Sequence, residues 1–431
     1  MRNDFQDWEK LRRKPVAILG AGVSGRGVGA LLDRLEWKYE TYDEQGRVFG
    51  QTEARTCSLV VFSPGFAQAH PWIELALEEN IPVLGEMDFG ACFLENPVIG
   101  ITGTNGKTTL TTLLAHAWNA MGKPAVAAGN LGLPLCELLA KGLAGDAVVF
   151  LEVSSFQAQG MNNLCPRSVL WTNFEEDHLD HHKNEKEYFL AKANLAGKVE
   201  EGSVMIGRSV SEKARELDHA LPACTEVVER KREDASFLPK GHFLSSFPQL
   251  ENLSIAKAFA QSAGIDERDF NQAILTYQPE PHRLEKIAKV GYATFWNDSK
   301  ATNVAAAVAA CRNFSGTLFW IGGGKSKGED SSRLSCLIKP FVKRAYVIGE
   351  MGETLGRNLR KQGIVATFCN SLKEAVTRAY GEVTESTTVL FSPGFASFDS
   401  FSSYAERGKS FVQSVFDLKK LVSGTTQECI N

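Results

Sequence analysis

Residues 98–114 read VIGITGTNGKTTLTTLL and contain the most informative pattern in the chain. A short apolar strand leads into a glycine loop, and Lys107 and Thr108 open a helical run. Backbone N–H groups of such a loop bind phosphate, the lysine reaches the β- and γ-phosphates, and the Thr108 hydroxyl ligates Mg²⁺. Ile101 stands where the general pattern has a glycine. The sequence predicts a nucleotide-phosphate site formed by Gly103, Thr104, Asn105, Gly106, Lys107, Thr108 and Thr109.

Short apolar strands alternate with helix-length amphipathic segments along almost the whole chain. This spacing is typical of parallel sheets with crossover helices, and it predicts the α/β class. At about 150 residues per domain, a chain of 431 residues divides into about three domains. A plausible linker at 85–97 and two prolines near 278–284 suggest where the domains meet.

Three domains are therefore expected. We predict an N-terminal Rossmann-like domain over residues 1–92, a central P-loop ATPase domain with a mostly parallel sheet over 93–280, and a C-terminal Rossmann-like domain over 281–431. The polar stretch 207–248 is expected to form peripheral structure.

Composition limits the possible partners. The chain is 43% hydrophobic with a net charge of −4, which excludes a disordered scaffold and gives no bulk attraction to nucleic acid or to anionic membranes. Nine scattered cysteines without a CxxC pair favour free thiols in a reducing compartment. The charged N-terminus has no apolar signal region, and no apolar run approaches the ~20 residues of a membrane span. We predict a cytoplasmic protein.

Near the N-terminus, the strand at 16–19 leads into the loop GAGVSG at 20–25. Asp43 follows the next strand, where a Rossmann fold holds its ribose-binding acid. Three interpretations remain open from these residues: a nicotinamide dehydrogenase, a tight turn for packing, or a site for another diphosphate ligand. The junction LVVFSPGFA at 59–67 returns almost unchanged as TVLFSPGFA at 388–396, and both are either ligand loops or simple turns.

Charged side chains follow two strands of the central region. Glu152 ends an apolar strand, where an unpaired carboxylate is costly, so a metal or a polar partner is expected. The segment TNFEEDHLDHH at 172–182 either holds a cation or forms a solvated turn; His178 is the better ligand candidate, and His181 and His182 are predicted at the surface. Lys192, on a helical stretch, is by spacing alone an ordinary surface lysine.

The last third contains further loops of interest. PHR at 281–283 and NDSKATN at 297–303 precede an alanine-rich helix, and an Asp-Ser pair there is either an anion or ribose site or a helix cap. The segment IGGGKSKGED at 321–330 is a glycine loop with two lysines, which suits an anionic substrate.

Taken together, these segments resemble the Mur ligase family from about residue 14 to about residue 417. The resemblance rests on TGTNGKTT, LEVSSFQ, TNFEEDHLDHH, YFLAKANL, PHR, NDSKATN, GGGKSKG and SPGFASFDSFSSYAERG, in this order. It implies an ATP-dependent ligase that adds D-glutamate to UDP-N-acetylmuramoyl-L-alanine through an acyl phosphate, in peptidoglycan precursor synthesis. The alternatives are another ligase of the superfamily, such as folylpolyglutamate synthetase or a different Mur ligase, and a non-ligase P-loop module.

The resemblance also implies a role for each matched residue, and a monomeric enzyme with two Mg²⁺ ions is expected. For catalysis and metal binding it implies Lys107, Thr108, Glu152, His178 and a carbamylated Lys192. For ATP it adds Asn252, Arg283 and Asp298 to the glycine loop. For the UDP-substrate it implies Gly22, Val23, Ser24, Gly25, Asp43, Ser63, Pro64, Gly65, Asn130, Ser154, Ser155 and Gln157. For D-glutamate it implies Lys327, Ser397, Phe398 and Tyr404.

Two segments depart from the family pattern. The family usually has His-Asn-x-x-Asn before the last helical part of its ATPase domain, whereas this chain has Glu251-Asn252 and then Ile255 in place of the second asparagine. Recognition of adenine is therefore expected to differ. The tail from Val422 onward has no counterpart in the family, and we expect it to be disordered.

Overall fold

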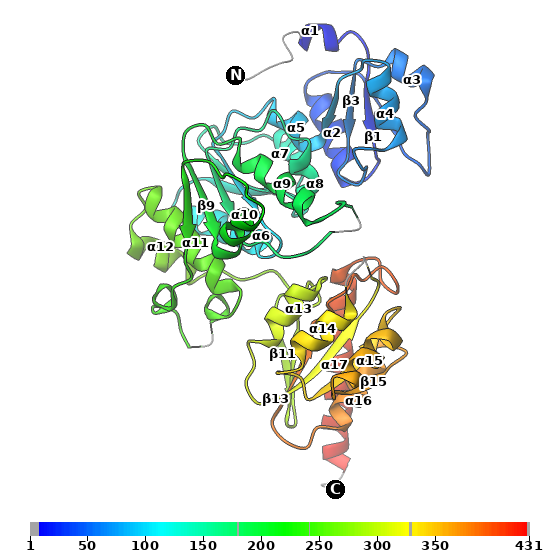
Figure 1. Ribbon diagram of the computed structural model, residues 1–431, viewed down its shortest axis with the longest axis vertical. Helices are drawn as coiled ribbons and strands as arrows, with labels where there is room; N and C mark the ends of the chain where they lie inside the picture. The colour runs from blue at the N-terminus through cyan, green and yellow to red at the C-terminus, as the bar shows by residue number, and fades with distance from the viewer. Residues whose placement is uncertain (1–7, 179–180, 241, 327–329, 429–431) are drawn as a thin grey trace. The chain divides into compact units, whose positions relative to one another are not determined.

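The computed structural model describes residues 8–178, 181–240, 242–326 and 330–428 (Figure 1). Its contacts divide the chain into two compact units. The first unit contains residues up to 174 together with 181–238 and 250–277, and the second contains 175–180, 239–249 and the chain from 278 onward. The first unit holds two sheets and the second unit holds one, so the three-domain α/β fold with mostly parallel sheets is confirmed.

The N-terminal sheet has the order β2-β1-β3-β4, and all its strands are parallel. Buried apolar side chains cover both of its faces, which is why its central strand reads as an unbroken apolar run. Its elements are α1 (Trp8–Leu11), β1 (Val16–Leu19), α2 (Val23–Arg34), β2 (Tyr39–Tyr42), α3 (Gln51–Thr56), β3 (Leu59–Phe62), α4 (Pro71–Glu78), β4 (Val83–Gly85) and α5 (Glu86–Ala91).

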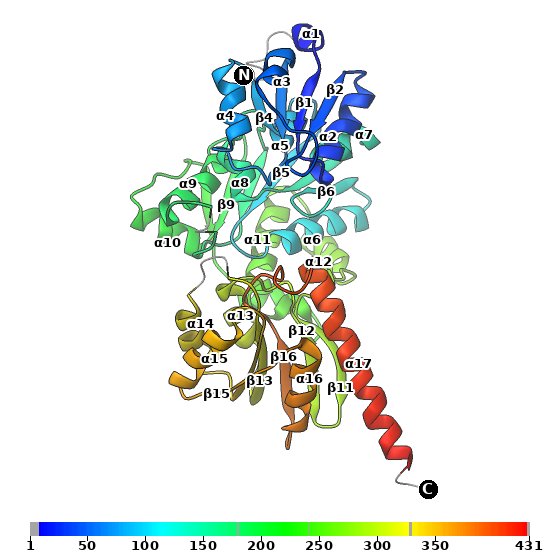
Figure 2. The same cartoon turned by 90° about the vertical axis from the view of Figure 1, so that its right-hand side faces the viewer.

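The central sheet has the order β10-β9-β8-β5-β7-β6, again all parallel. Figure 2 labels β9, β5 and β6 of this sheet. Its middle strand β5 leads into the glycine loop. The elements are β5 (Val98–Thr102), α6 (Lys107–Ala120), β6 (Ala125–Gly129), α7 (Leu135–Lys141), β7 (Val148–Glu152), α8 (Ser155–Gln159), β8 (Ser168–Trp171), α9 (Glu185–Ala196), β9 (Ser203–Gly207), α10 (Arg208–Glu216), β10 (Thr225–Val228), η1 (Arg232–Ala235), η2 (Phe243–Ser245), α11 (Gln249–Ser262) and α12 (Glu267–Ile274).

The sheet of the second unit has the order β11-β12-β16-β13-β14-β15. The pair β11 and β12 is antiparallel, and every other neighbouring pair is parallel. Its elements are β11 (Glu285–Val290), β12 (Ala293–Asn297), α13 (Val304–Cys311), β13 (Thr317–Gly323), α14 (Ser331–Ile338), β14 (Arg344–Ile348), α15 (Gly352–Lys361), β15 (Val365–Phe368), α16 (Leu372–Gly381), β16 (Thr387–Phe391) and α17 (Tyr404–Glu428).

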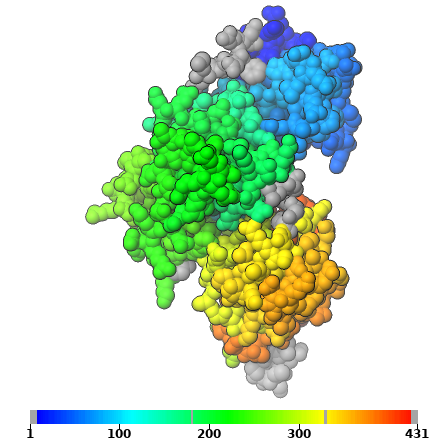
Figure 3. Space-filling model, viewed as in Figure 1, coloured from blue at the N-terminus to red at the C-terminus, as the bar shows by residue number. Residues whose placement is uncertain are grey.

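The expected linker at 85–97 is wrong, because its first half is the buried helix α5. Glu86 accepts a hydrogen bond from the Cys136 N–H at 2.8 Å, and Asp88 accepts one from the Asn163 N–H at 2.7 Å. These bonds join α5 to the loops of the central sheet within the first unit, whose surface is coloured blue to green in Figure 3. The segment is therefore structural, and the boundary at 92/93 stays a prediction.

The expectation of a disordered tail from Val422 is also wrong as far as Glu428, and residues 429–431 lie outside the described residues. Helix α17 begins at Tyr404 and continues to Glu428. Its first part packs on the sheet through Phe411, Val415 and Leu418, and the remaining turns extend the same helix. These apolar residues lie on one face of the helix and fix its first part on the sheet, and the tail continues the same helix.

Candidate active site

The glycine loop is held tightly between β5 and α6. Gly103 and Gly106 have φ of +144° and +85°, where other residues are strained. A Cβ at Gly103 would lie 2.0 Å from the Thr172 Oγ1, and one at Gly106 would lie 2.5 Å from the Asn252 Oδ1. Asn252, one of the predicted ATP contacts, therefore lies against the loop. Ile255 is buried in α11, so it offers the loop no polar group.

Lys107 bends back over the loop that precedes it. Its Nζ donates to the carbonyl oxygens of Gly103 and Thr104, each at 2.9 Å. Thr108 and Thr109 follow in the first turn of α6, and the Thr109 Oγ1 is buried without a hydrogen-bond partner. The ammonium thus occupies the mouth of the cradle, where a bound phosphate would meet it.

Two residues that sequence reasoning missed fix the shape of this loop. The Asn105 N–H donates to the Asn173 Oδ1 at 2.9 Å, and the Asn105 carbonyl accepts hydrogen bonds from the Thr172 Oγ1 at 2.6 Å and the Asn173 Nδ2 at 3.1 Å. Thr172 and Asn173 follow β8, the strand beside β5, and they open the acidic segment that the sequence marked only for its charges. Their position at a strand end was the signal available.

Glu152 lies at the same edge of the sheet as the loop. The register places it opposite Ile101, one residue before β5 ends. Its Oε1 accepts a hydrogen bond from the Asn130 Nδ2 at 3.2 Å, while its Oε2 is buried and has no partner. A buried carboxylate oxygen without a partner is costly, so this atom is available to a cation. Asn130, predicted for the UDP-substrate, is thus brought to the carboxylate.

Lys192 is a buried residue of the site, and the surface interpretation left open by its spacing is wrong. Its side chain is 1% exposed on α9, and its Nζ donates to the Gly103 carbonyl at 2.9 Å. The Nζ also lies 4.7 Å from the centre of the Tyr188 ring. The structure therefore brings Lys107 and Lys192 to one carbonyl of the glycine loop.

The three histidines of the acidic segment have different environments. His178 has φ of +57°, its N–H donates to the Asp177 Oδ1 at 2.9 Å, and its contacts place it with the second unit. His181 is exposed, as predicted, and its ring lies 4.2 Å from that of Phe156. His182 is buried, which contradicts the prediction, and its Nε2 lies 3.0 Å from the Ser155 Oγ. Aromatic side chains pack around His182 and bury it, although the segment to which it belongs is polar.

The N-terminal glycine loop is shaped for close backbone approach. Gly20 has φ of +104°, and a Cβ there would lie 2.8 Å from the Ser63 Oγ, which is buried without a partner. The half-buried Asp43 accepts hydrogen bonds from the N–H groups of Ala21 and Gln45, and these bonds lower the pKa of its carboxyl. Asp43 thus holds the loop that contains Gly22, Val23, Ser24 and Gly25.

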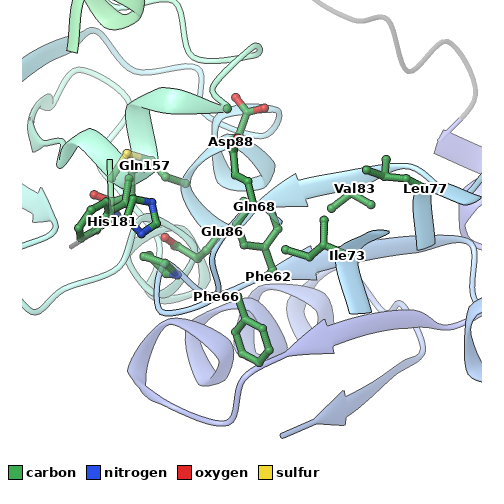
Figure 4. Close-up of a pocket in the computed structure, with 15 residues that line it drawn as sticks. Phe62, Phe66, Gln68, Ile73, Leu77, Val83, Glu86, Asp88, Gln157 and His181 are labelled. Carbon is green, nitrogen blue, oxygen red and sulfur yellow. The ribbon is translucent and has the colours of Figure 1, made fainter. Parts of the chain in front are cut away.

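A cavity of about 220 Å³ lies between this N-terminal sheet and α8. Figure 4 shows Phe62, Phe66 and Ile73 on one side, with Gln157 and His181 on the other. Pro64, which the prediction placed at the UDP-substrate with Ser63 and Gly65, also lines the cavity.

Ser154 and Gln157 cap α8 reciprocally, because the Gln157 Oε1 accepts from the Ser154 N–H at 3.0 Å.

In the second unit, Asp298 is partly buried and directly follows the end of β12. It accepts hydrogen bonds from the Leu284 N–H at 3.1 Å and from the Ser392 Oγ at 2.7 Å, and burial raises its pKa to about 7. Arg283 has a buried Nη2 without a hydrogen-bond partner, 3.6 Å from Glu280. Asp298 is therefore bonded to Ser392 of the second SPGF loop, and the Arg283 guanidinium lies near enough to act on its charge.

Asp298 should make stability depend on pH. Its pKa is about 7 in the folded state and near 3.8 when unfolded, so its contribution is fully present below pH 3.8 and is lost as the pH rises through 7. Relative to Asp298→Asn, the unaltered protein should lose roughly 1.4 kcal/mol of unfolding free energy for each pH unit between these values. Urea unfolding of both proteins at pH 4 to 8 measures this difference, and parallel pH profiles would contradict it.

The residues predicted for D-glutamate lie at the end of the second SPGF loop. Ser397 is buried, Phe398 is 63% exposed, and Tyr404 begins α17 with the Lys300 Nζ 3.9 Å from its ring centre. Lys327 lies outside the described residues. The exposed ring of Phe398 is free to contact a ligand in this structure.

Arg407, which sequence reasoning missed, ties these loops together. It is 1% exposed and donates to the carbonyl oxygens of Ser299, Phe395 and Ala396 at 3.0 to 3.1 Å. Burial lowers its pKa to about 10. The ERG triplet in α17 was the only signal, since nothing local shows that a guanidinium will be buried.

Arg407→Lys should destabilise the second unit. An ammonium has fewer donors in a different geometry, so carbonyl oxygens stay unpaired, and we expect a loss of about 2–4 kcal/mol. Urea unfolding checks this, with Arg378→Lys as the matched control because Arg378 forms an exposed ion pair with Glu374. A loss no larger than that of the control would contradict the role given to Arg407.

Comparison with known proteins identifies the family. A model of the Mur ligase middle domain matches residues 101–235, and a model of the Mur ligase glutamate ligase domain matches residues 282–395. A UDP-N-acetylmuramoylalanine--D-glutamate ligase of Chlamydia pneumoniae is 33% identical over 417 residues, covering 92% of this chain and 96% of that protein. The chain belongs to the Mur ligase family.

Solved structures similar to this Mur ligase share its fold. The UDP-N-acetylmuramate-alanine ligase MurC of Thermotoga maritima has a TM-score of 0.60 at 15% identity, covering 94% of this chain and 100% of that one. The MurF ligase of Thermotoga maritima in complex with ADP has a TM-score of 0.58 at 15% identity, covering 88% and 98%. Among the described residues of this Mur ligase, no helix is long and apolar enough to cross a membrane.

Proposed function

We propose that this Mur ligase adds D-glutamate to UDP-N-acetylmuramoyl-L-alanine with ATP, through an acyl phosphate, in peptidoglycan precursor synthesis. The activity named for the Chlamydia pneumoniae relative supports the substrate pair. The observation on which the proposed chemistry depends is that the side-chain Nζ atoms of Lys107 and Lys192 both donate to the Gly103 carbonyl oxygen. It brings one lysine from the phosphate loop and one from α9 to the point where phosphoryl transfer would begin.

ATP binds with its β- and γ-phosphates in the loop from Gly103 to Thr109, with Lys107 neutralising charge on the transferred group. The ADP in the Thermotoga maritima MurF structure supports a nucleotide in this fold. Asn252 supports the loop from α11. Arg283 and Asp298 are further nucleotide contacts in this proposal, the guanidinium as a donor and the carboxyl group as an acceptor.

Mg²⁺ fits the residues at the edge of the central sheet. The Glu152 Oε2 is buried without a partner, and the Thr108 hydroxyl opens the neighbouring helix. In the part of the chain that the structure describes, no three His, Cys, Asp or Glu side chains cluster, so an ion here takes its other ligands from phosphate and water. When bound, Mg²⁺ offsets phosphate charge. We assign one ion to Thr108 and Glu152 and a second to His178 and a carbamate on Lys192.

The carbamate on Lys192 rests on the burial of its amine. Keeping an ammonium out of water is costly, which favours the neutral amine that reacts with CO₂. Carbamylation releases one proton and leaves an anion, so the modified Lys192 would be one of the residues that hold the metal. Lys192 then orients the acceptor carboxylate toward the γ-phosphate.

The UDP-substrate lies along the first unit. Its diphosphate meets the loop of Gly22, Val23, Ser24 and Gly25 near Asp43, and the loop of Ser63, Pro64 and Gly65 flanks it. From there the substrate extends toward Asn130, Ser154, Ser155 and Gln157, at the cavity in Figure 4. D-Glutamate is bound in the second unit by Lys327, Ser397, Phe398 and Tyr404, with the lysine facing a carboxylate. We expect a monomer that works in the cytoplasm.

Phosphate release measures this function directly. ADP and phosphate should appear only when UDP-N-acetylmuramoyl-L-alanine and D-glutamate are both present. L-Glutamate, D-alanine and L-lysine serve as controls for the choice of amino acid. Turnover with an uncharged amino acid in place of D-glutamate, or without any UDP-substrate, would contradict the proposal.

A further inference from the structure

His182 is the one buried histidine of the acidic segment among the described residues, and the proposed chemistry gives it no role. We infer that His182 is a positioning residue, which links the substrate segment at Ser155 to the phosphate loop at Thr104. This inference rests on the proposed function. It concerns how the substrate segment at Ser155 and the phosphate loop at Thr104 are held at a fixed distance from each other.

One side of His182 faces the substrate segment. Its side chain is 1% exposed, and its Nε2 lies 3.0 Å from the Oγ of Ser155, the first residue of α8. Its ring stacks on that of Phe156 at 5.6 Å and 26°. A buried imidazole with a hydrogen bond and a ring contact has a defined orientation. The start of α8, where the UDP-substrate is proposed to bind, is therefore fixed against it.

The other side of His182 faces Tyr188, at 5.3 Å between ring centres. Tyr188 is buried as well, and its hydroxyl donates to the Thr104 Oγ1 at 3.2 Å. The same ring lies under the Lys192 Nζ. A shift of Tyr188 would therefore displace both the glycine loop and the lysine proposed to hold the metal.

These contacts form a continuous path from Ser155 through His182 and Tyr188 to Thr104. No two of these residues are neighbours in the sequence. The acceptor carboxylate must meet the γ-phosphate at close range, and a misplacement of about 1 Å can reduce the rate by about 100-fold. His182 sets this distance by bonding at one end of the path and packing at the other.

Two substitutions separate positioning from simple packing. His182→Gln places an amide nitrogen near the position of Nε2 and keeps a bond to Ser155, whereas His182→Phe keeps the aromatic volume without the bond. Positioning requires that the Gln variant retain most of kcat/KM for the UDP-substrate and that the Phe variant lose it roughly ten- to hundredfold. KM for D-glutamate should stay within about twofold, because that site lies in the second unit. If His182 acts only by packing, the Phe variant should instead have a higher kcat/KM for the UDP-substrate than the Gln variant.

A double-mutant cycle with Ser155→Ala tests the bond itself. If Ser155 and His182 act through one bond, the Phe effect should be at least about fivefold smaller in the Ser155→Ala background. His116→Phe is the control, because the His116 Nε2 lies 2.8 Å from a hydroxyl oxygen, the Thr276 Oγ1, in an exposed bond outside the path. Thermal unfolding verifies that each variant is folded, and the cycle can be run with His182→Gln if the Phe variant unfolds.

The outcomes separate the two claims. An unaltered enzyme that shows no turnover with UDP-N-acetylmuramoyl-L-alanine, ATP and D-glutamate would overturn the proposed function and this inference with it. An active unaltered enzyme, together with independent effects of Ser155 and His182 or with a Phe variant better than the Gln variant, would overturn the inference alone.

Discussion

Lys107→Ala should reduce ATP-dependent turnover by about 10³-fold or more, because it removes the cation that offsets charge on the transferred phosphoryl group. The Lys107 Nζ already lies at the mouth of the loop, within 2.9 Å of the Gly103 and Thr104 carbonyl oxygens. The loss should appear mainly in kcat, measured as phosphate release at saturating substrates. The bond partners of the loop itself, Thr172 and Asn173, remain in place, so the fold should survive.

Lys141→Ala is the control for this substitution. Lys141 belongs to α7 in the same unit and forms an exposed ion pair with Glu137, so its loss should leave the rate within about twofold. A folded Lys107→Ala variant with near-normal turnover would show that the loop does not bind the reacting phosphate.

Lys192→Ala should nearly abolish activity, because it removes both the proposed carbamate and the bond to the Gly103 carbonyl. A short carboxylic acid such as acetate should restore part of the rate by occupying the vacated space as a metal ligand. The unaltered enzyme should lose activity in CO₂-free buffer and regain it with bicarbonate, whereas the variant should not respond to bicarbonate. Together these three measurements report on the carbamate separately from the fold.

Lys186→Ala is the matched control, since Lys186 is an exposed lysine on the same helix α9. It should behave as the unaltered enzyme does. Full activity of Lys192→Ala, or activity of the unaltered enzyme that is independent of CO₂ and bicarbonate, would remove the carbamate from the mechanism.

Local patterns predicted the fold class and several of its strands correctly. The apolar runs at 98–102 and 148–152 are adjacent strands, and the glycine loop between β5 and α6 has the predicted place. The errors concern segments whose polar sequence conceals burial. His182 and α5 were both misjudged, because aromatic packing and bonds to backbone N–H groups of distant segments bury them. The aromatic rings and N–H groups that bury them belong to distant parts of the chain, so a short stretch of sequence does not reveal them.

The amino-acid sequence alone was sufficient for the α/β class, the place of the glycine loop between a strand and a helix, and the family, because each depends on residues that are close together in the chain or on the order of several motifs. The packed chain was needed to bring Lys192 to Gly103, 89 positions away, and to leave one oxygen of Glu152 without a partner. It also placed Arg407 under the carbonyl groups of two loops. Such contacts arise when whole strands and helices pack, so the spacing of residues along one segment does not encode them.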